Sequence, residues 1–185
     1  FWELTYWKTP EWYDELTEGE QLHPGIFRQL RPWLRDQVVL DAGAGTGRAS
    51  LDALRQGARQ VIAVDPVPGL LRILATKAEA RHLRDRVTLI QGHFDALPLP
   101  PDSVDLTLSC ASFTVADEAK ASAILTELRR VTKSGGRIVF IWPRPQDVRW
   151  LERQDFRHVK LEVQGEMRIR YRSLAIALRI ADRFY

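Results

Sequence analysis

Short apolar runs and stretches of helical periodicity alternate along most of the chain. Five apolar runs have the pattern of strands buried on both faces, at 38–41, 60–65, 86–91, 104–109 and 137–142. Before and between them, apolar residues recur on one helical face at 24–33, 48–56, 69–82 and 117–132. Strands and helices in this order predict a parallel sheet covered on both faces, a three-layer α/β/α doubly wound fold.

The last part of the chain has a different pattern. A short helix is expected at 147–152, followed by strands at 158–163 and 167–171. The Gln164-Gly165 turn between these two strands predicts an antiparallel hairpin. Ser173 is then expected to cap a final helix.

The first thirteen residues are dense in large aromatic side chains: Phe1, Trp2, Tyr6, Trp7, Trp12 and Tyr13. Apolar side chains in this number are rarely left exposed to water, so we expect them to pack against a ligand or another part of the protein. Two interpretations carry equal weight: the segment is a lid that closes over a substrate, or it covers one edge of the core.

The most informative stretch joins the first strand to the next helix. Asp41 ends the apolar run, and Gly43, Gly45 and Gly47 follow at every second position. Glycines at this spacing allow backbone conformations closed to other residues and let a ligand lie directly on the main chain. The following helix directs its unpaired N–H groups at that ligand and favours a negatively charged group. We interpret this loop as a cradle.

Asp65 ends the second apolar run, 20 residues after Gly45. A carboxylate at this place can accept hydrogen bonds from both hydroxyls of a ribose. The alternative is that Asp65 only caps the helix that begins near Pro68.

Composition and charge narrow the setting. The 185 residues, 45% hydrophobic and 28% charged, suit one soluble domain with a real core. Without a long apolar run or a signal sequence, we expect a cytoplasmic protein with no membrane partner. Cys110 is the single cysteine, so neither an internal disulfide nor a metal site is expected.

The charge is concentrated near the end of the chain. Residues 129–185 carry 14 Lys and Arg against 6 Asp and Glu, a net charge of +8. These basic residues are dispersed and are not interleaved with aromatics that could stack on bases. Nucleic acid is therefore the less favoured partner, although the charge leaves it open.

The stretch from Asp41 to Gly47 resembles the Asp-x-Gly-x-Gly-x-Gly motif of class I S-adenosylmethionine-dependent methyltransferases, of the small-molecule type 11 kind. The resemblance implies S-adenosyl-L-methionine as the cofactor. It also implies the family's Rossmann-like seven-stranded sheet, in which the hairpin supplies the last two strands and the last strand lies antiparallel beside the fifth. Residues 1–36 then form the N-terminal arm and helix, the candidate lid, and residues 37–185 form the S-adenosylmethionine-binding part of a single domain.

Residues 92–99 resemble the Gly-Asp-Ala-x-x-Leu-Pro-Phe segment that holds adenine in that family. His93 stands where the family has an aspartate. A neutral imidazole nitrogen can still accept from the adenine amino group, and Asp95 is the alternative acceptor. The cofactor-binding residues that the resemblance implies are Asp41, Gly43, Ala44, Gly45, Gly47, Asp65, Pro66, His93, Phe94, Asp95 and Ser109.

A second segment, 127–137, resembles the family's Leu-Arg-Arg-Val-Leu-Lys-Pro-Gly-Gly. It is expected to end the preceding helix at Lys133-Ser134-Gly135-Gly136, with glycine as the C-cap, and to carry no chemistry.

In the resemblance, the fourth strand ends at the methyl acceptor, which places Ser109, Cys110, Ser112 and Phe113 at the acceptor site. The Asn/Asp-Pro-Pro-aromatic clamp used on planar amino groups is absent, and no general base is evident, so catalytic residues are left unassigned. Cys110 is interpreted as a small buried thiol rather than a nucleophile.

These expectations converge on an S-adenosylmethionine-dependent methyltransferase with a small-molecule acceptor. The alternatives are a tRNA or rRNA methyltransferase and a non-catalytic S-adenosylmethionine-binding protein. The residues specify neither the acceptor nor the oligomeric state.

Overall fold

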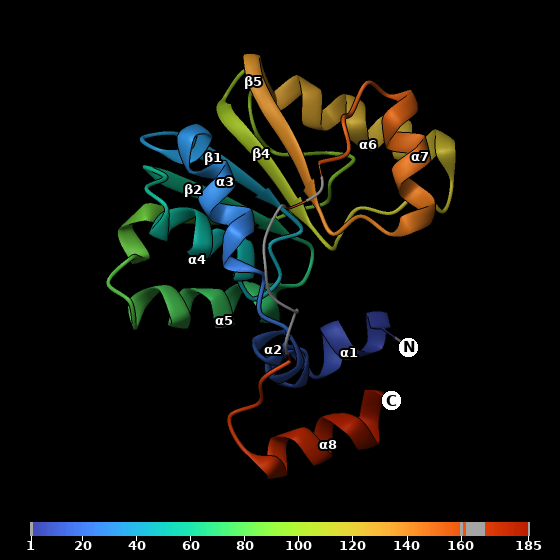
Figure 1. Ribbon diagram of the computed structural model, residues 1–185. Coiled ribbons are helices and arrows are strands. Elements are labelled where there is room, and N and C mark those ends of the chain that lie inside the picture. The colour runs from blue at the N-terminus through green and yellow to red at the C-terminus, as the bar shows by residue number, and fades with distance from the viewer. Residues whose placement is uncertain (1, 160, 162–168, 185) are drawn as a thin grey trace.

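The computed structural model describes residues 2–159, 161 and 169–184. In this part of the chain, five parallel strands form one sheet in the order β3-β2-β1-β4-β5 (Figure 1). The strands are β1 (Val38–Ala42), β2 (Gln60–Asp65), β3 (Val87–Gln91), β4 (Val104–Cys110) and β5 (Thr132–Ile141). The strand order reverses between β1 and β4, and open α/β sheets bind ligands beyond the carboxyl ends of the strands at such a point.

Helices cover both faces of the sheet, as the alternation of apolar segments predicts. One hydrophobic cluster joins the sheet to α3 (Pro24–Leu34), α4 (Arg48–Arg55) and α5 (Pro68–Glu79). A second cluster joins the other face to α6 (Glu118–Val131) and α7 (Pro145–Arg153). Adjacent residues of β1 belong to different clusters because successive side chains of a strand point to opposite faces. The three-layer α/β/α Rossmann-like architecture is therefore confirmed.

The sheet is smaller than the seven-stranded one that the resemblance implies, and this prediction is wrong for the described chain. The five strands present are all parallel. Most of the expected hairpin at 158–163 and 167–171 lies outside the described residues. Ile169, which is described, forms an isolated antiparallel bridge with Glu20 instead of pairing with β5. Ile169 therefore lies beside the end of the N-terminal arm.

The junction between α6 and β5 also differs from the prediction. The helix ends at Val131, and Thr132 is its C-cap, with its hydroxyl donating to the Leu128 carbonyl at 2.7 Å. The segment 133–136 belongs to β5 instead of a glycine C-cap. Gly135 has a φ of +79°, and the β4–β5 register shifts between Val104 and Leu106, so glycine here accommodates an irregularity within the strand.

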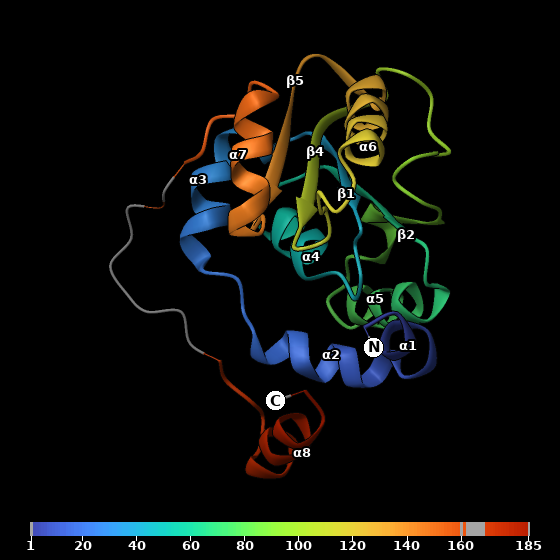
Figure 2. The same cartoon turned by 90° about the vertical axis from the view of Figure 1, so that its right-hand side faces the viewer.

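The N-terminal arm consists of two helices that periodicity did not predict, α1 (Trp2–Lys8) and α2 (Pro10–Gly19). Helix α2 packs against α5 and against the last helix, α8 (Leu174–Phe184), so the two ends of the chain lie together (Figures 1 and 2). Asp14 of α2 forms an ion pair with Lys77 of α5. A short 3₁₀ turn, η1 (Arg84–Arg86), precedes β3. Among the described helices, none is long and apolar enough to span a bilayer.

Candidate functional site

The glycine loop joins β1 to α4 in a tight turn built on left-handed backbone. Gly43, Gly45 and Gly47 have φ values of +79°, +54° and +89°, which L side chains rarely adopt. The N–H groups of Gly43 and Ala44 donate to the Val64 carbonyl at 2.9 and 3.1 Å, so the loop is fastened to the end of β2.

The three glycines are required for different reasons. A Cβ at Gly43 would lie 2.5 Å from Ser112 Cβ and 2.7 Å from the Phe94 ring, and a Cβ at Gly47 would collide with Leu74 of α5. At Gly45 the nearest atom to a Cβ is in the Tyr13 ring, 3.4 Å away. Gly47 therefore leaves room for Leu74 of α5, while Gly43 and Gly45 form a surface that other side chains cover.

Asp65 lies at the carboxyl end of β2 and reaches across to this loop. One carboxylate oxygen accepts from the Gly45 N–H at 2.8 Å, and the other accepts from the Val67 N–H at 2.9 Å. The side chain is buried. Burial raises its pKa, and the two hydrogen bonds and nearby His93 partly lower it. The bond to Val67 forms an Asx-type turn just before α5, whose N-cap is Val67 with no side-chain capping bond. The bond to Gly45 makes Asp65 part of the loop.

Asp41 lies beneath the loop and is fully buried. Its Oδ2 accepts a 2.5 Å hydrogen bond from the Ser50 hydroxyl, whereas its Oδ1 has no hydrogen-bond partner among the described residues. Burial raises the pKa of Asp41 to about 6, against the opposing effect of the Ser50 hydrogen bond. A buried carboxylate oxygen without a donor is costly and is suited to a cationic or N–H group of a ligand.

Of the residues after β3 that were predicted to bind adenine, some lie near the glycine loop and others do not. The Phe94 ring lies against Gly43, and exposed His93 is close enough to lower the pKa of Asp65. Pro66 is half-buried and is held through its carbonyl by the Gln91 side chain at 3.2 Å. Asp95 is exposed, and no contact in the described structure brings it to the loop.

The end of β4 brings two of the predicted acceptor residues against the glycine loop. The hydroxyls of Ser109 and Ser112 are 2.9 Å apart, and Ser112 donates to the Ala42 carbonyl at 3.0 Å. Phe113 is buried and packs against Phe140 and Trp150, with ring centroids 4.6 and 5.9 Å apart. Its ring thus belongs to the core under α6 and α7.

Cys110 lies at the same end of β4, beside Arg48. Burial raises the pKa of its thiol to about 12, and the nearby Arg48 charge only partly opposes this effect. Only the thiolate is a strong nucleophile, so the environment does not activate this thiol.

Helix α2 forms a roof over the loop. Tyr13 and Thr17 lie one turn apart on α2, and together with Asp41, Gly43, Ala44 and neighbouring residues they line a cavity of about 20 Å³. Tyr6 packs edge-on against Tyr13 with ring centroids 4.8 Å apart. Burial raises the pKa of both phenols above the usual value, most strongly for Tyr13, so both hydroxyls stay protonated at neutral pH. Ligand pockets usually enclose ~300 Å³ or more, so a cofactor must displace this roof.

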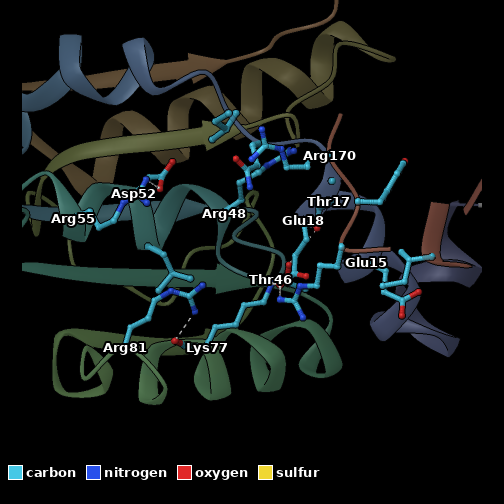
Figure 3. A pocket seen from close by; sticks show the side chains of 17 residues that line it. Glu15, Thr17, Glu18, Thr46, Arg48, Asp52, Arg55, Lys77, Arg81 and Arg170 are labelled. Carbon is cyan, nitrogen blue, oxygen red and sulfur yellow. Dashed lines mark hydrogen bonds and ion pairs between the residues drawn. The ribbon is translucent and has the colours of Figure 1, made fainter. Parts of the chain in front are cut away.

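A larger cavity of about 410 Å³ lies beside the cradle, between α2, α4, α5 and the segment before α8 (Figure 3). Thr17, Thr46 and Arg48 line both cavities. The sequence reasoning assigned no role to Thr46 or Arg48. Thr46 lies inside the glycine motif and Arg48 directly follows it, and this position is the signal that could have identified them. The large cavity depends on contacts between distant residues, which the periodicity of the sequence does not reveal.

The residues present fit S-adenosylmethionine. The unpartnered Oδ1 of Asp41 suits the amino group of its methionyl part, Gly43 and Gly45 bring no side chain of their own to the loop surface, and Asp65 retains unused lone pairs for a ribose. The roles of the individual residues toward the cofactor remain predictions.

Comparison with known proteins agrees with this geometry. A family model described as "Methyltransferase domain" matches residues 39–136, more than half of the chain. An uncharacterized methyltransferase of Mycobacterium bovis is 34% identical over 104 residues, which are 56% of this chain and 39% of the relative. The chain thus spans about two fifths of the length of that curated relative.

Two solved structures share the fold. A putative S-adenosylmethionine-dependent methyltransferase of Methanococcus maripaludis has a TM-score of 0.60 and 18% identity, covering 84% of this chain and 74% of its own. Geranyl diphosphate C-methyltransferase of Streptomyces coelicolor, solved with Mg²⁺, geranyl diphosphate and S-adenosylhomocysteine, has a TM-score of 0.54 and 22% identity, covering 62% and 43% of the two chains.

Proposed function

This chain belongs to the class I S-adenosylmethionine-dependent methyltransferase family, and on that premise we propose that it methylates a small-molecule acceptor. The observation that carries the proposal is the meeting of Asp41, Gly43 and Asp65 with Ser109 and Ser112 at the point where the strand order reverses.

The cofactor supplies, when bound, a methyl group on a sulfonium that is already activated for displacement. The role of the chain is then mainly binding, alignment and exclusion of water. Asp41 offers a buried negative charge to the amino group, Asp65 offers its carboxylate to the ribose, and the Phe94 ring and His93 border the adenine side. Ser109 and Ser112 hold each other at the end of β4, where the acceptor is delivered.

The acceptor end favours a nucleophile that needs no strong base. The two serine hydroxyls are hydrogen-bonded to each other, and the Cys110 thiol, with its pKa near 12, stays protonated at neutral pH. Asp41 lies beneath the loop rather than at this end. An amine, a thiolate or a stabilised carbanion suits such a site because each can attack without losing a proton to the protein.

Helix α2 is proposed to act as a lid. Tyr13 covers Gly45, and Thr17 lies 3.5 Å from Thr46 through their hydroxyls, so the helix closes the space above the loop. Closure of this kind excludes water and holds the acceptor in line.

A nucleic-acid acceptor is disfavoured by how the basic residues near the end of the chain are engaged. Arg144 forms a two-point ion pair with Asp147, and Arg153, Arg172 and Arg179 pair with Glu118, Glu18 and Glu15. Arg137 lies over the Trp33 ring at 4.4 Å. Cations that are already paired contribute less to phosphate binding.

The test is incubation of the protein with S-adenosylmethionine and a metabolite extract, followed by mass spectrometry. The expected result is S-adenosylhomocysteine together with one metabolite that is heavier by a methyl group. Methylation of added tRNA or rRNA with no methylated metabolite would contradict the proposal.

A further inference from the structure

The cavity of about 410 Å³ beside the cradle carries an excess of positive charge. Its lining includes six cationic side chains against the carboxylates of Glu15, Glu18 and Asp52. The six are Arg48, Arg55, Lys77, Arg81, Arg170 and Arg172.

Three of these cations are neutralised within the protein. Lys77 pairs with Asp14 and with Glu18, Arg172 pairs with Glu18, and Arg55 pairs with Asp52. The pairs of Lys77 and Arg172 join α2 to α5 and to the segment before α8, whereas the Arg55 pair lies within α4. All three cations offer little further charge to a ligand.

The other three cations form no close ion pair among the described residues, although the Asp52 carboxylate is near enough to Arg48 and Arg81 for their charges to oppose the rise in its pKa that burial causes. The Arg48 guanidinium lies 3.9 Å from the Glu20 carboxylate and donates one hydrogen bond to the Glu20 backbone carbonyl at 2.8 Å. Arg81 donates to the Lys77 carbonyl at 2.9 Å, and no ion pair is present for Arg170 in the described part of the chain.

Backbone contacts bring Arg170 to Arg48. Ile169 forms its bridge with Glu20, and the Arg170 N–H donates to the Gly19 carbonyl at 2.9 Å, while Arg48 donates to Glu20. Both side chains therefore line the cavity near the end of α2, and Arg81, in the turn just after α5, points toward α4 (Figure 3). Two guanidinium groups that line the same end of a cavity match a group that carries two or more negative charges.

Arg48 connects this end to the methyl-transfer site. Its guanidinium lies 5.0 Å from the Trp142 ring centroid at the end of β5 and beside Cys110 at the end of β4. Only 18% of the Arg48 side chain is exposed, so stacking and burial fix its position. With Thr17 and Thr46 it also lines the small cavity above the glycine loop.

We propose that the large cavity binds the anionic part of the methyl acceptor, a phosphate or polycarboxylate group held by Arg48 and Arg170, while the rest of the acceptor extends over Thr46 toward the end of β4. This inference rests on the proposed function for the acceptor's role. The excess of positive charge in the cavity does not depend on that function.

The first experiment measures binding of pyrophosphate and of citrate by titration calorimetry. The parent protein should bind at least one probe, Arg170→Gln should weaken that binding about tenfold or more, and higher salt should weaken it further. Arg149→Gln, at an exposed residue of α7 outside the cavity, removes the same charge and should bind like the parent. The preferred probe separates a phosphate ligand from a carboxylate ligand.

Binding of neither probe at millimolar concentration would overturn the proposal, and so would equal loss in Arg149→Gln. Tight binding of a short RNA that Arg170→Gln abolishes, without binding of either small anion, would also overturn it.

The second experiment fractionates the metabolite extract on an anion exchanger before incubation with S-adenosylmethionine. The methylated product should arise from the retained fraction and fall about tenfold or more with Arg170→Gln, while S-adenosylhomocysteine binding stays as in the parent. A product from the unretained fraction would overturn this inference and leave the proposed function standing. No product from any fraction would count against the proposed function, and the probe titrations would still decide whether the cavity binds anions.

Discussion

The carboxylate of Asp65 accepts a 2.8 Å hydrogen bond from the backbone N–H of Gly45. The residue proposed to bind the ribose therefore also fixes the loop proposed to hold the methionyl part. Its other oxygen accepts from Val67 at 2.9 Å, at the start of α5. A carboxylate has about four lone-pair positions, so Asp65 can hold both backbone groups and still accept from a ligand. The shape of the cradle is thus fixed by hydrogen bonds within the protein.

Gly43→Ala should unfold more easily than the parent and lose cofactor binding. The new Cβ would lie 2.5 Å from Ser112 and 2.7 Å from Phe94, and displacing them should cost ~1–3 kcal/mol in addition to backbone strain. Gly135→Ala is the matched control, because Gly135 has the same φ of +79° with no atom within 4 Å of its Cβ position. It should show the ~1–2 kcal/mol of backbone strain alone. Urea unfolding and S-adenosylhomocysteine titration measure both effects, and equal behaviour of the two variants would refute the steric account.

Asp41 should make the protein less stable as the pH rises from about 4 to above 6. Burial raises the pKa of Asp41 from 3.8 to about 6, so the folded state holds a proton that the unfolded state releases. The stabilisation is complete below the unfolded pKa and is lost as the pH rises through the folded pKa. A pKa difference of this size lowers the free energy of unfolding by ~3 kcal/mol between pH values below 4 and pH 7.

Asp41→Asn removes this titration, so the stability difference between variant and parent should change across pH 4–7 in favour of the variant. Urea unfolding at four or five pH values measures the difference, in which the contributions of all other groups cancel. A difference that stays constant with pH would show that Asp41 does not titrate in this range.

Tyr13→Ala should let the cofactor enter faster. The cavity above the loop is about 20 Å³ with the Tyr13 ring in place, so binding waits for the roof to open. Removal of the ring should raise the association rate of S-adenosylhomocysteine about tenfold, measured by stopped-flow tryptophan fluorescence. Tyr13→Phe keeps the ring and serves as the control. Identical rates in all three proteins would mean that α2 is not a lid.

Local sequence patterns predicted the central fold because a few residues determine each element. The apolar runs ending at Asp41 and Asp65 coincide with β1 and β2, and the glycine spacing located the tight turn before α4. The contact between Asp65 and Gly45 follows from parallel neighbours whose carboxyl ends share one edge of the sheet.

The predictions that differ from the structure concern long-range packing. The position of α2 over the loop depends on the contact between Tyr13 and Gly45 and on the ion pair between Asp14 and Lys77. These residues are far apart in the sequence, so the local pattern of apolar residues does not predict their contacts. The end of α6 also depends on a distant contact. The Thr132 hydroxyl forms hydrogen bonds with the Leu128 carbonyl and with the Thr107 hydroxyl of β4, so residues 132–136 join the sheet. The bridge from Ile169 to Glu20 joins residues at opposite ends of the chain.

The most direct test of the account is titration calorimetry of S-adenosylhomocysteine into the parent and Asp65→Ala. The variant loses the hydrogen bonds that the ribose hydroxyls donate to the charged carboxylate, so its affinity should fall by ~2–4 kcal/mol, about 30-fold to 1,000-fold. Asp85→Ala, an exposed carboxylate in η1, should bind like the parent. An Asp65→Ala protein that remains folded and binds within threefold of the parent would contradict the assignment of this loop as the cofactor site.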